Sequence, residues 1–396
     1  MIAQWFFSTT VRHACAIRKH VEKLVHHQRD ILSPPAIEAL QSAMGDMRNT
    51  LAAKADKAEL EKQIGRLETA ANKWLKPYPN AAWRENVEVL LVALTVAMGI
   101  RTFFLQPFKI PTGSMQPTLF GVTSANLIHS PGANIPTGLR RVGEWFEGMS
   151  YVHLTAENDG DLRRVDPPTG LRIFNIKQTL WIDNEPYTIW FPPDYGAPPA
   201  GTLEARAGLR PGQTFHKGED IVKLLVNAGD HLFVDRLTYN FRKPQRGEIV
   251  VFETQGIPEE YRNYYGIPAD QFYIKRLVGL GGEKVQLGHD RHLIIDGKRL
   301  GASTPHFERV YSFNPGDPTR DSHYSGHVDG PGIAPLFQNQ PEGIVIPDGD
   351  YMVMGDNTAN SLDSRFWGYF PAKYVIGKSF FVYWPITDRF GWGYHR

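Results

Sequence analysis

The stretch LLVALTVAMGIRTFFLQPFKIPTGSMQPTLF, residues 90–120, separates two parts of the chain that differ in character. Residues 89–105 carry one charged side chain, that of Arg101, and match the short end of the about 17–25 residues that cross a bilayer. We therefore expect a transmembrane helix at residues 87–106, with a buried core helix as the alternative. Glu88 and Arg101 lie where their side chains can reach the two membrane interfaces.

Basic residues beside this segment predict its orientation. Lys73, Lys76 and Arg84 precede it, whereas few basic residues follow it closely. Because positively charged flanks stay on the cytoplasmic side, we expect residues 1–86 in the cytoplasm and residues 107–396 outside it.

The composition indicates a globular protein of more than one domain. The chain has 396 residues, of which 42% are hydrophobic and 21% charged, which is enough apolar material for a packed core. A net charge of +1 gives no reason to expect nucleic acid as a partner. The one cysteine, Cys15, allows neither an intrachain disulfide nor a cysteine metal site. We expect no metal and no cofactor.

The first 86 residues are predicted to be helical. Apolar residues recur at helical spacing over residues 14–24, and Ser33-Pro34-Pro35 is a typical helix start. Over residues 36–75, two apolar seams follow each other out of phase, which predicts one long helix with a stutter or a helical hairpin. We expect this apolar surface to pack on the preceding helix or, alternatively, to support self-association as a coiled coil. Trp5-Phe6-Phe7 is too short for a signal-peptide core of about 7–15 residues, and membrane contact by these three residues is left open.

After residue 107 the sequence becomes rich in Gly, Pro, aromatic and β-branched residues. Short segments typical of strands, such as LRIFNIKQ, TLWIDNEPYTIWF, GEIVVF, FYIKRLVGL and DYMVMGD, alternate with turn signals. Asp296-Gly297 between two such segments is a strong hairpin signal. We expect a mainly β region of antiparallel sheets, joined to an N-terminal α-helical region by one transmembrane helix.

Ser114 lies between two proline-bounded corners in PTGSMQPT. Pro111 and Pro117 stiffen the backbone and Gly113 permits a close approach, as the presentation of a nucleophile requires. An ordinary surface turn is the alternative. The stretch is neither a G-x-S-x-G elbow nor an S-x-x-K motif, which argues against the α/β-hydrolase and penicillin-binding mechanisms.

A serine nucleophile needs a base, and no histidine stands in a pattern that links it to Ser114. Lys275, within FYIKRLVGL, is the other candidate, because burial among apolar residues lowers the pKa of a lysine toward neutrality. A strand lysine that reaches solvent is the alternative. Alternation along the strand does not decide, since Lys275 and Arg276 each have apolar neighbours on their own face.

A third polar stretch, MGDNTANSLDSRFWGYFP, covers residues 354–371. A calcium loop that began at Asp356 would have Thr358, Ser361 and Trp367 at its third, sixth and twelfth positions. The acid, glycine and glutamate required there are missing, so a calcium site is not expected. We expect a polar turn that holds active-site groups, with a solvated loop as the alternative.

In this order, and after a membrane span, these stretches resemble type I signal peptidases, the bacterial membrane enzymes that remove signal peptides from exported proteins. The similarity covers roughly residues 87–119, 229–285 and 351–385, less than half of the chain. Its most specific stretches are IPTGSMQPTL, GDHLFVDRLTYNFRKPQRGEIVVF, YIKRLVGLGGEKV and MGDNTANSLDSRFWGYFP.

The resemblance implies a role for each matching residue. Ser114 is expected to be the nucleophile and Lys275 the general base. The hydroxyl of Thr112 and the backbone N–H of Ser114 are expected to hold the oxyanion, and Ser361 to orient the lysine ammonium. The other expected site residues are Asp363, Ser364 and Arg365 beneath the site; Gly355, Asp356 and Asn357 in a shaping turn; and Ile110, Pro111, Met115, Leu119, Tyr273 and Ile274 in pockets for small substrate side chains.

The resemblance also implies an activity and a location. We expect a membrane-bound serine endopeptidase that cuts signal peptides from exported preproteins after small residues, in an Ala-X-Ala-like pattern. Its expected place is the bacterial inner membrane, single-pass and in contact with lipid, with the N-terminus cytoplasmic and the catalytic region on the outer side. The alternative is a specialised or catalytically silent relative that acts as a membrane-anchored binding or assembly protein.

The expected catalytic β domain is assembled from residues 107–119, 229–285 and 351–388, and residues 389–396 form a C-terminal tail. Residues 120–228 depart from the family as an insertion of unknown fold with β content, and residues 286–350 form a second β extension. Thr358-Ala359 stand where the family often has Arg-Asp, for which we expect a changed local turn and retained activity. The familiar form has a second span near its N-terminus, and one span is predicted here.

Overall fold

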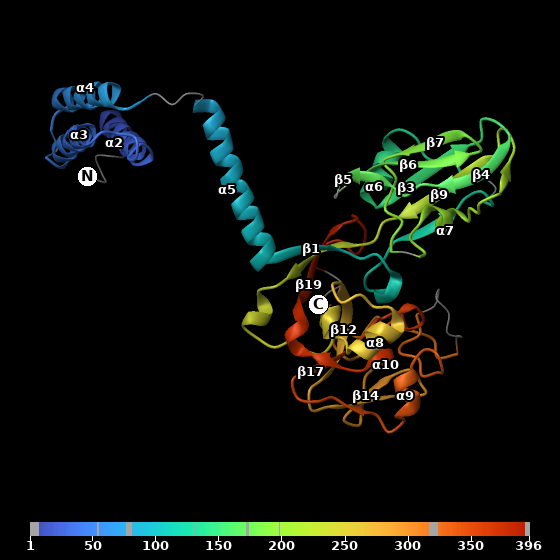
Figure 1. Ribbon diagram of the computed structural model, residues 1–396. Coiled ribbons are helices and arrows are strands. Elements are labelled where there is room, and N and C mark those ends of the chain that lie inside the picture. Colours follow the sequence, from blue (N-terminus) through green and yellow to red (C-terminus); the bar gives the residue numbers. More distant parts are fainter. Residues whose placement is uncertain are drawn as a thin grey trace. The chain divides into compact units, whose positions relative to one another are not determined.

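The computed structural model describes residues 8–53, 55–76, 81–130, 132–171, 174–197, 199–316 and 324–392 (Figure 1). The chain divides into two compact units, Met1–Leu94 and Thr95–Arg396, and each is considered by itself. Trp5-Phe6-Phe7 and residues 393–396 of the expected tail lie outside the described residues.

Three helices pack together in the first unit: α2 (Thr9–His27), α3 (Pro34–Ala52) and α4 (Lys57–Trp74). Pro34 begins α3 directly after Ser33, as the sequence predicts, and Asp56 caps α4 by accepting a hydrogen bond from Glu59 N. Residues 36–75 therefore form a helical hairpin. The hairpin packs on α2 around a core that includes Leu40 and Leu67. Self-association through this region stays a prediction.

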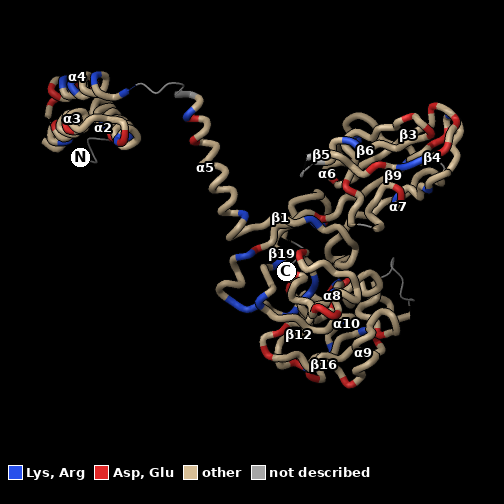
Figure 2. The backbone as a smooth tube through the Cα atoms, in the orientation of Figure 1, with Lys and Arg blue, Asp and Glu red and all other residues tan. Residues whose placement is uncertain are grey.

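Helix α5 (Ala81–Phe103) begins before the expected residue 87. Among the described residues, Trp83–Phe103 is the one helical stretch long and apolar enough to cross a membrane, and none of its apolar window is buried. It is therefore not the buried core helix of the alternative reading. Its charged residues lie toward the two ends, as Figure 2 shows.

The junction between α5 and the sheet is short. Phe104 N donates to Ile100 O in the last helical turn, and Phe104 O accepts from Arg236 N beside the first strand. Strand β1 (Leu105–Lys109) thus follows the helix with one residue between them.

A seven-stranded antiparallel sheet, in the order β1-β10-β19-β11-β12-β17-β18, organises the second unit. Its central strand β11 is buried on both faces, because Ile249 and Val251 pack in one apolar cluster and Val250 and Phe252 in another. The expected mainly β fold is confirmed. The further elements are β10 (His231–Asp235), β11 (Ile249–Glu253), α8 (Glu259–Tyr265), β12 (Phe272–Leu280), β17 (Asp350–Met354), α10 (Ser364–Trp367), β18 (Phe370–Pro371) and β19 (Val375–Trp384).

The second extension packs against this sheet. Its apolar cluster includes Phe307 and Tyr311 together with Met352 and Met354 of β17. The predicted hairpin at Asp296-Gly297 is confirmed, since both residues have positive φ, 49° and 78°. The elements of this region are β13 (Lys284–Leu287), β14 (Leu293–Ile295), β15 (Lys298–Arg299), α9 (Pro335–Asn339) and β16 (Ile344–Val345).

The insertion, residues 120–228, has a core of its own, which includes Leu180 and Leu224. The segment TLWIDNEPYTIWF is not a single strand, because the chain turns at Asp183, where φ is 47°, and Leu180 pairs with Tyr187 across the hairpin. The elements are β2 (Thr123–Asn126), α6 (Leu139–Phe146), β3 (Met149–Thr155), β4 (Gly160–Val165), β5 (Thr169–Leu171), β6 (Phe174–Ile182), β7 (Glu185–Trp190), α7 (Leu203–Ala207), β8 (Thr214–Phe215) and β9 (Asp220–Asn227).

Candidate active site

Ser114 lies just beyond the end of β1. Ile110 N donates to Asp230 O at 2.9 Å, which keeps the chain beside β10 after the strand has ended. Gly113–Met115 then form one turn of 3₁₀ helix, in which Ser114 is buried, with 4% of its surface exposed. Ser114 therefore lies on a short, buried turn that follows a hydrogen-bonded segment. It is not part of an ordinary surface turn, which was the alternative.

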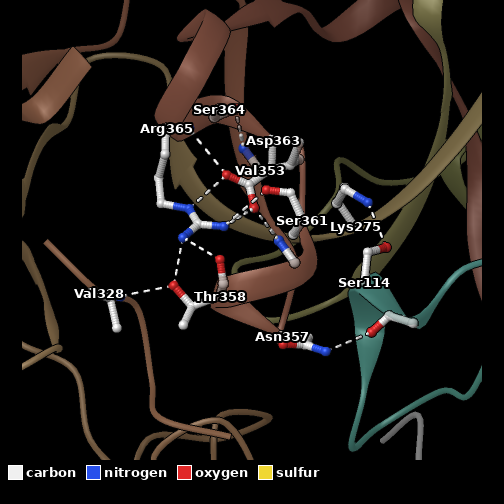
Figure 3. Close-up of polar contacts among 12 residues, drawn as sticks. Ser114, Lys275, Val328, Val353, Asn357, Thr358, Ser361, Asp363, Ser364 and Arg365 are labelled. Atoms are coloured by element: carbon white, nitrogen blue, oxygen red, sulfur yellow. Dashed lines mark hydrogen bonds and ion pairs between the residues drawn. The ribbon is translucent and has the colours of Figure 1, made fainter. Parts of the chain in front are cut away.

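Lys275 on β12 points at this serine (Figure 3). Its Nζ donates to Ser114 Oγ at 2.7 Å, and the lysine is 5% exposed. Burial lowers the pKa of Lys275 from 10.5 to about 8, while the nearby charge of Asp363 acts in the opposite direction. The alternative of a solvent-reaching lysine is thus wrong. A lysine with this pKa is neutral in part of the population near pH 8.

Asp363 and Arg365 form a buried ion pair beneath the site, and both are 0% exposed. Two nitrogens of Arg365 each donate to the carboxylate at 2.8 Å, and Gly355 N donates to it at 2.9 Å. Burial alone would raise the pKa of Asp363, but Arg365 and the Gly355 N–H hold it below its ordinary value. Ser364 Oγ accepts from Val353 N at 3.0 Å, which ties the following turn to β17.

The turn Gly355–Asn357 contacts the serine segment directly. Asn357 N donates to Ser114 O at 3.1 Å, and Asn357 Nδ2 donates to Gly113 O at the same distance. A Cβ added at Gly355 would lie 2.5 Å from Ser114 O and 2.2 Å from Ser361 Oγ. The close packing explains why glycine stands at position 355.

A second buried ion pair was not foreseen from the sequence. Arg276 Nε and Nη2 donate to the two carboxylate oxygens of Asp356 at 2.7 and 2.6 Å, and Thr118 Oγ1 donates to the same carboxylate. These contacts therefore connect three separate parts of the site: Arg276 on β12, Asp356 in the turn, and Thr118 after the serine. An arginine next to Lys275 in a mostly apolar strand was the available signal, since a buried guanidinium requires an anionic partner.

Thr358 receives hydrogen bonds from two directions. Its Oγ1 accepts from Val328 N of the second extension at 2.9 Å and from Arg365 Nη1. The residue is 3% exposed. The threonine that departs from the family pattern therefore connects the extension to the Asp363–Arg365 pair.

Thr358→Val is expected to lower the melting temperature by roughly 2–10 °C, because the buried Arg365 Nη1 and the part-buried Val328 N–H then lose this acceptor, at a cost of about 1–3 kcal/mol. Thermal unfolding of the detergent-solubilised protein measures this. Thr358→Ser is the matched control, since it keeps the hydroxyl. Equal melting temperatures for the valine variant and the wild type would contradict the assigned contact.

The remaining predicted site residues differ in burial, and not all of them make the contacts expected from the sequence. Ser361 is buried, and within the described part of the chain no hydrogen bond joins its Oγ to Lys275 Nζ, so the expected contact with the ammonium is not made here; its hydroxyl instead helps to lower the pKa of Asp363. Thr112 and Pro111 are exposed, and Tyr273 and Ile274 are half-buried. Three of the predicted pocket residues are core residues, with at most 1% exposure: Ile110, Met115 and Leu119.

No group of three or more His, Cys, Asp or Glu side chains stands close enough to hold a metal ion in the described ranges.

Comparison with known proteins identifies relatives of the regions that hold these residues. The model of a family described as signal peptidase, peptidase S26, matches residues 83–128 and 222–384, more than half of the chain. The unmatched stretch between them corresponds closely to the insertion.

Individual relatives agree with this match. A signal peptidase I from Leptolyngbya laminosa is 32% identical over 162 residues, which cover 41% of this chain and 64% of that protein. A probable signal peptidase I-2 from Synechocystis sp. is 28% identical, covering 41% of this chain and 58% of that protein. The chain thus spans less than two thirds of these relatives. A solved signal peptidase I from Enterococcus faecalis is 26% identical and covers 35% of this chain and 97% of its own, with a TM-score of 0.24.

Proposed function

Since the chain belongs to the signal peptidase family, peptidase S26, we propose that it is a membrane-bound serine endopeptidase that removes N-terminal signal peptides from exported preproteins. The observation that carries this proposal is the 2.7 Å contact between Lys275 Nζ and Ser114 Oγ, in a setting that lowers the pKa of the lysine to about 8. A serine beside a lysine of this kind can be activated at mild pH without histidine.

In the proposed mechanism, neutral Lys275 accepts the hydroxyl proton of Ser114 while Oγ attacks the scissile carbonyl. The Ser114 N–H and the Thr112 hydroxyl hold the resulting oxyanion. The lysine ammonium then gives its proton to the leaving amine of the mature protein, and the signal peptide remains as an ester on Ser114. Lys275 next accepts a proton from water, which hydrolyses the ester and frees the serine.

The sheet offers a place for an extended substrate. Among the described strands, β1 pairs with β10 alone, and β12 pairs with β17 from Arg276 onward, so Phe272–Lys275 has one unpaired edge. The rings of Phe108 and Phe272 lie 5.4 Å apart, which brings these two edges close together. We place the residues before the cut between them, as an added strand whose main chain gives affinity. Small side chains, as in Ala-X-Ala, suit a strand placed between these two edges.

Helix α5 supports the membrane part of the proposal. Its unburied apolar stretch, Trp83–Phe103, matches a single span. The basic residues before it favour a cytoplasmic N-terminus and a catalytic region on the outer side of a bacterial inner membrane. Signal peptides of preproteins and membrane lipid are then the partners of this chain.

The test of this function is the cleavage of a purified preprotein, carrying an Ala-X-Ala site, by the detergent-solubilised protein across pH 6–10. We expect kcat/KM to rise about tenfold per pH unit and to level off near pH 8, where Lys275 loses its proton. The value of kcat/KM rises with pH because only the neutral amine of Lys275 can accept a proton, and its fraction increases as the pH approaches the pKa. Absence of cleavage at every pH would contradict the proposal, and cleavage that declines from pH 6 to 9 would exclude Lys275 as the base.

A further inference from the structure

The insertion leaves and rejoins the catalytic sheet beside the serine segment. Phe120 N donates to Asp230 Oδ2, and Asp230 N donates to Phe120 O, both at 2.8 Å. Arg389 holds this pair, since its guanidinium donates to the buried Asp230 carboxylate and lies 4.1 Å from the centre of the Phe120 ring. A residue of the expected tail therefore fixes the two ends of the insertion together.

Three glycines from the insertion and its two ends press on the backbone of residues 110–112. A Cβ added at Gly229 would lie 1.9 Å from Ile110 O, and one at Gly121 would lie 2.2 Å from Thr112 O. Between them, a Cβ at Gly196 would lie 3.0 Å from Pro111 O. Gly121 and Gly229 belong to the ends, whereas Gly196 lies within the insertion. The insertion itself thus packs against the residues that immediately precede the catalytic turn.

The loop that carries Gly196, residues 194–197, is held firmly on the insertion side. Gly196 N donates to Asp194 Oδ1 at 2.7 Å, and Arg206 Nε donates to Tyr195 O at 3.0 Å. Arg206 Nη2 also donates to Val122 O at 3.1 Å. Tyr195 is 3% exposed and belongs to the apolar core of the insertion. The loop is therefore a fixed part of that core.

The same loop has an ion pair with the catalytic sheet. Asp194 contacts Nζ of Lys109, the last residue of β1, and the two side chains are 51% and 26% exposed. One loop of the insertion thus contacts two nearby positions, the Lys109 side chain and the Pro111 carbonyl, just before Thr112 and Ser114.

We propose that loop 194–197 is a positioning element for catalysis. By packing on Lys109 and Pro111, it sets where the Thr112 hydroxyl and the Ser114 N–H lie relative to the scissile carbonyl. This role rests on the proposed peptidase function, and it assigns to the insertion a contribution to turnover that is separate from any binding partner of its own. Asp194 and Gly196 are positioning residues that act through the serine segment.

Gly196→Ala tests the proposal, because the new methyl group would lie 3.0 Å from Pro111 O, 3.1 Å from Arg206 Nη2 and 3.3 Å from Val122 Cβ, so that the loop and the Pro111 backbone must shift slightly against each other. We expect kcat for preprotein cleavage to fall about tenfold, since misplacement by about 1 Å costs about 100-fold and a smaller shift suffices here. KM is expected to change less than twofold. The pH of half-maximal activity should stay nearly unchanged, because β12 keeps Lys275 buried while the serine segment shifts by less than about 1 Å.

Gly218→Ala is the matched control. Gly218 has a φ of +86°, close to the +100° of Gly196, and a Cβ there would meet no atom within 4 Å. Both variants therefore place an alanine at a positive φ within the insertion, and of the two only Gly196→Ala contacts Pro111. We expect kcat of Gly218→Ala to equal that of the wild type. Equal kcat values for the two variants would overturn the proposal.

Exchange of the charges gives a second test at the same place. Lys109→Asp and Asp194→Lys are each expected to lower kcat two- to fivefold, because the ion pair is partly exposed and screened. The double variant restores the pair in reverse and should regain most of the lost rate. Double-variant activity no better than that of the singles would contradict a positioning role for the pair.

Amide hydrogen exchange, measured by mass spectrometry, separates this proposal from the peptidase function. In peptides that cover residues 110–116, we expect faster exchange in Gly196→Ala than in the wild type, and unchanged exchange in Gly218→Ala. If the wild type cleaves no preprotein while this difference is present, the peptidase function fails and the packing role of the loop stands. If the wild type cleaves and the difference is absent, the loop does not position the serine segment.

Discussion

Ser114→Ala and Lys275→Met are each expected to reduce kcat/KM for preprotein cleavage by about 10⁴-fold or more. In the proposed mechanism the hydroxyl of Ser114 attacks, and Lys275 Nζ, 2.7 Å from its Oγ, accepts the proton. Because the two residues act as a unit, the double variant should lose no more activity than either single variant. The measurement is single-turnover cleavage of a purified preprotein at pH 9.

Two controls separate this loss from misfolding. Lys275→Arg places a cation at position 275 that does not lose its proton, so it should be inactive up to pH 10. Lys275→Met removes a buried amine whose pKa is depressed by burial, so its melting temperature at pH 7 should equal or exceed that of the wild type. Cleavage by Lys275→Met within tenfold of the wild type would show that another group serves as the base.

Removal of Asp363 is expected to give the largest loss of stability. Asp363→Ala leaves the guanidinium of Arg365 buried without its carboxylate, which costs about 3–5 kcal/mol. The melting temperature should fall by roughly 10 °C, and cleavage should fall with it, because Gly355 N loses its acceptor beside Ser114. Thermal unfolding in detergent and the cleavage assay together measure both effects.

A double variant shows whether the loss comes from the unpaired charge. Asp363→Leu with Arg365→Met replaces the pair by apolar side chains and should recover a large part of the melting temperature. The pH dependence has a defined sign as well. The folded pKa of Asp363 lies below its ordinary 3.8, so its stabilising contribution is complete at neutral pH and is lost only as the pH falls through the lowered value. A melting temperature of Asp363→Ala within 2 °C of the wild type would contradict the prediction.

The sequence predicts the elements better than it predicts their contacts. Helices α3 and α4 follow from apolar seams and from Ser33-Pro34, and the Asp296-Gly297 hairpin follows from local turn chemistry. The direction of Lys275 does not follow, because Lys275 and Arg276 are both buried, on opposite faces of β12. A strand covered on both faces lacks the alternation of apolar and polar residues from which its facing could be inferred.

The other contacts that the sequence does not predict are between segments that lie far apart in the chain. Arg276, Asp356 and Thr118 are separated by up to 238 positions, and the carboxylate joins them only after the sheet has formed. The packing of Gly196 on Pro111 likewise depends on how the insertion folds. The family resemblance supplies candidate roles for the site residues, but the insertion is absent from the family pattern, and the resemblance therefore says nothing about its loop.

The connection at Phe104 links the proposed membrane helix to the sheet, so that the surrounding bilayer can affect the proposed reaction. The N–H of Phe104 completes the last turn of α5 and its carbonyl accepts a hydrogen bond from Arg236 N, so one residue separates α5 from β1. A helix longer than the local hydrocarbon thickness tilts to match it. If α5 spans a bilayer as proposed, this short connection predicts that a change in its tilt is felt at β1. We therefore expect the proposed preprotein cleavage to depend on bilayer thickness, and a comparison of its rate in thin and thick bilayers tests this expectation.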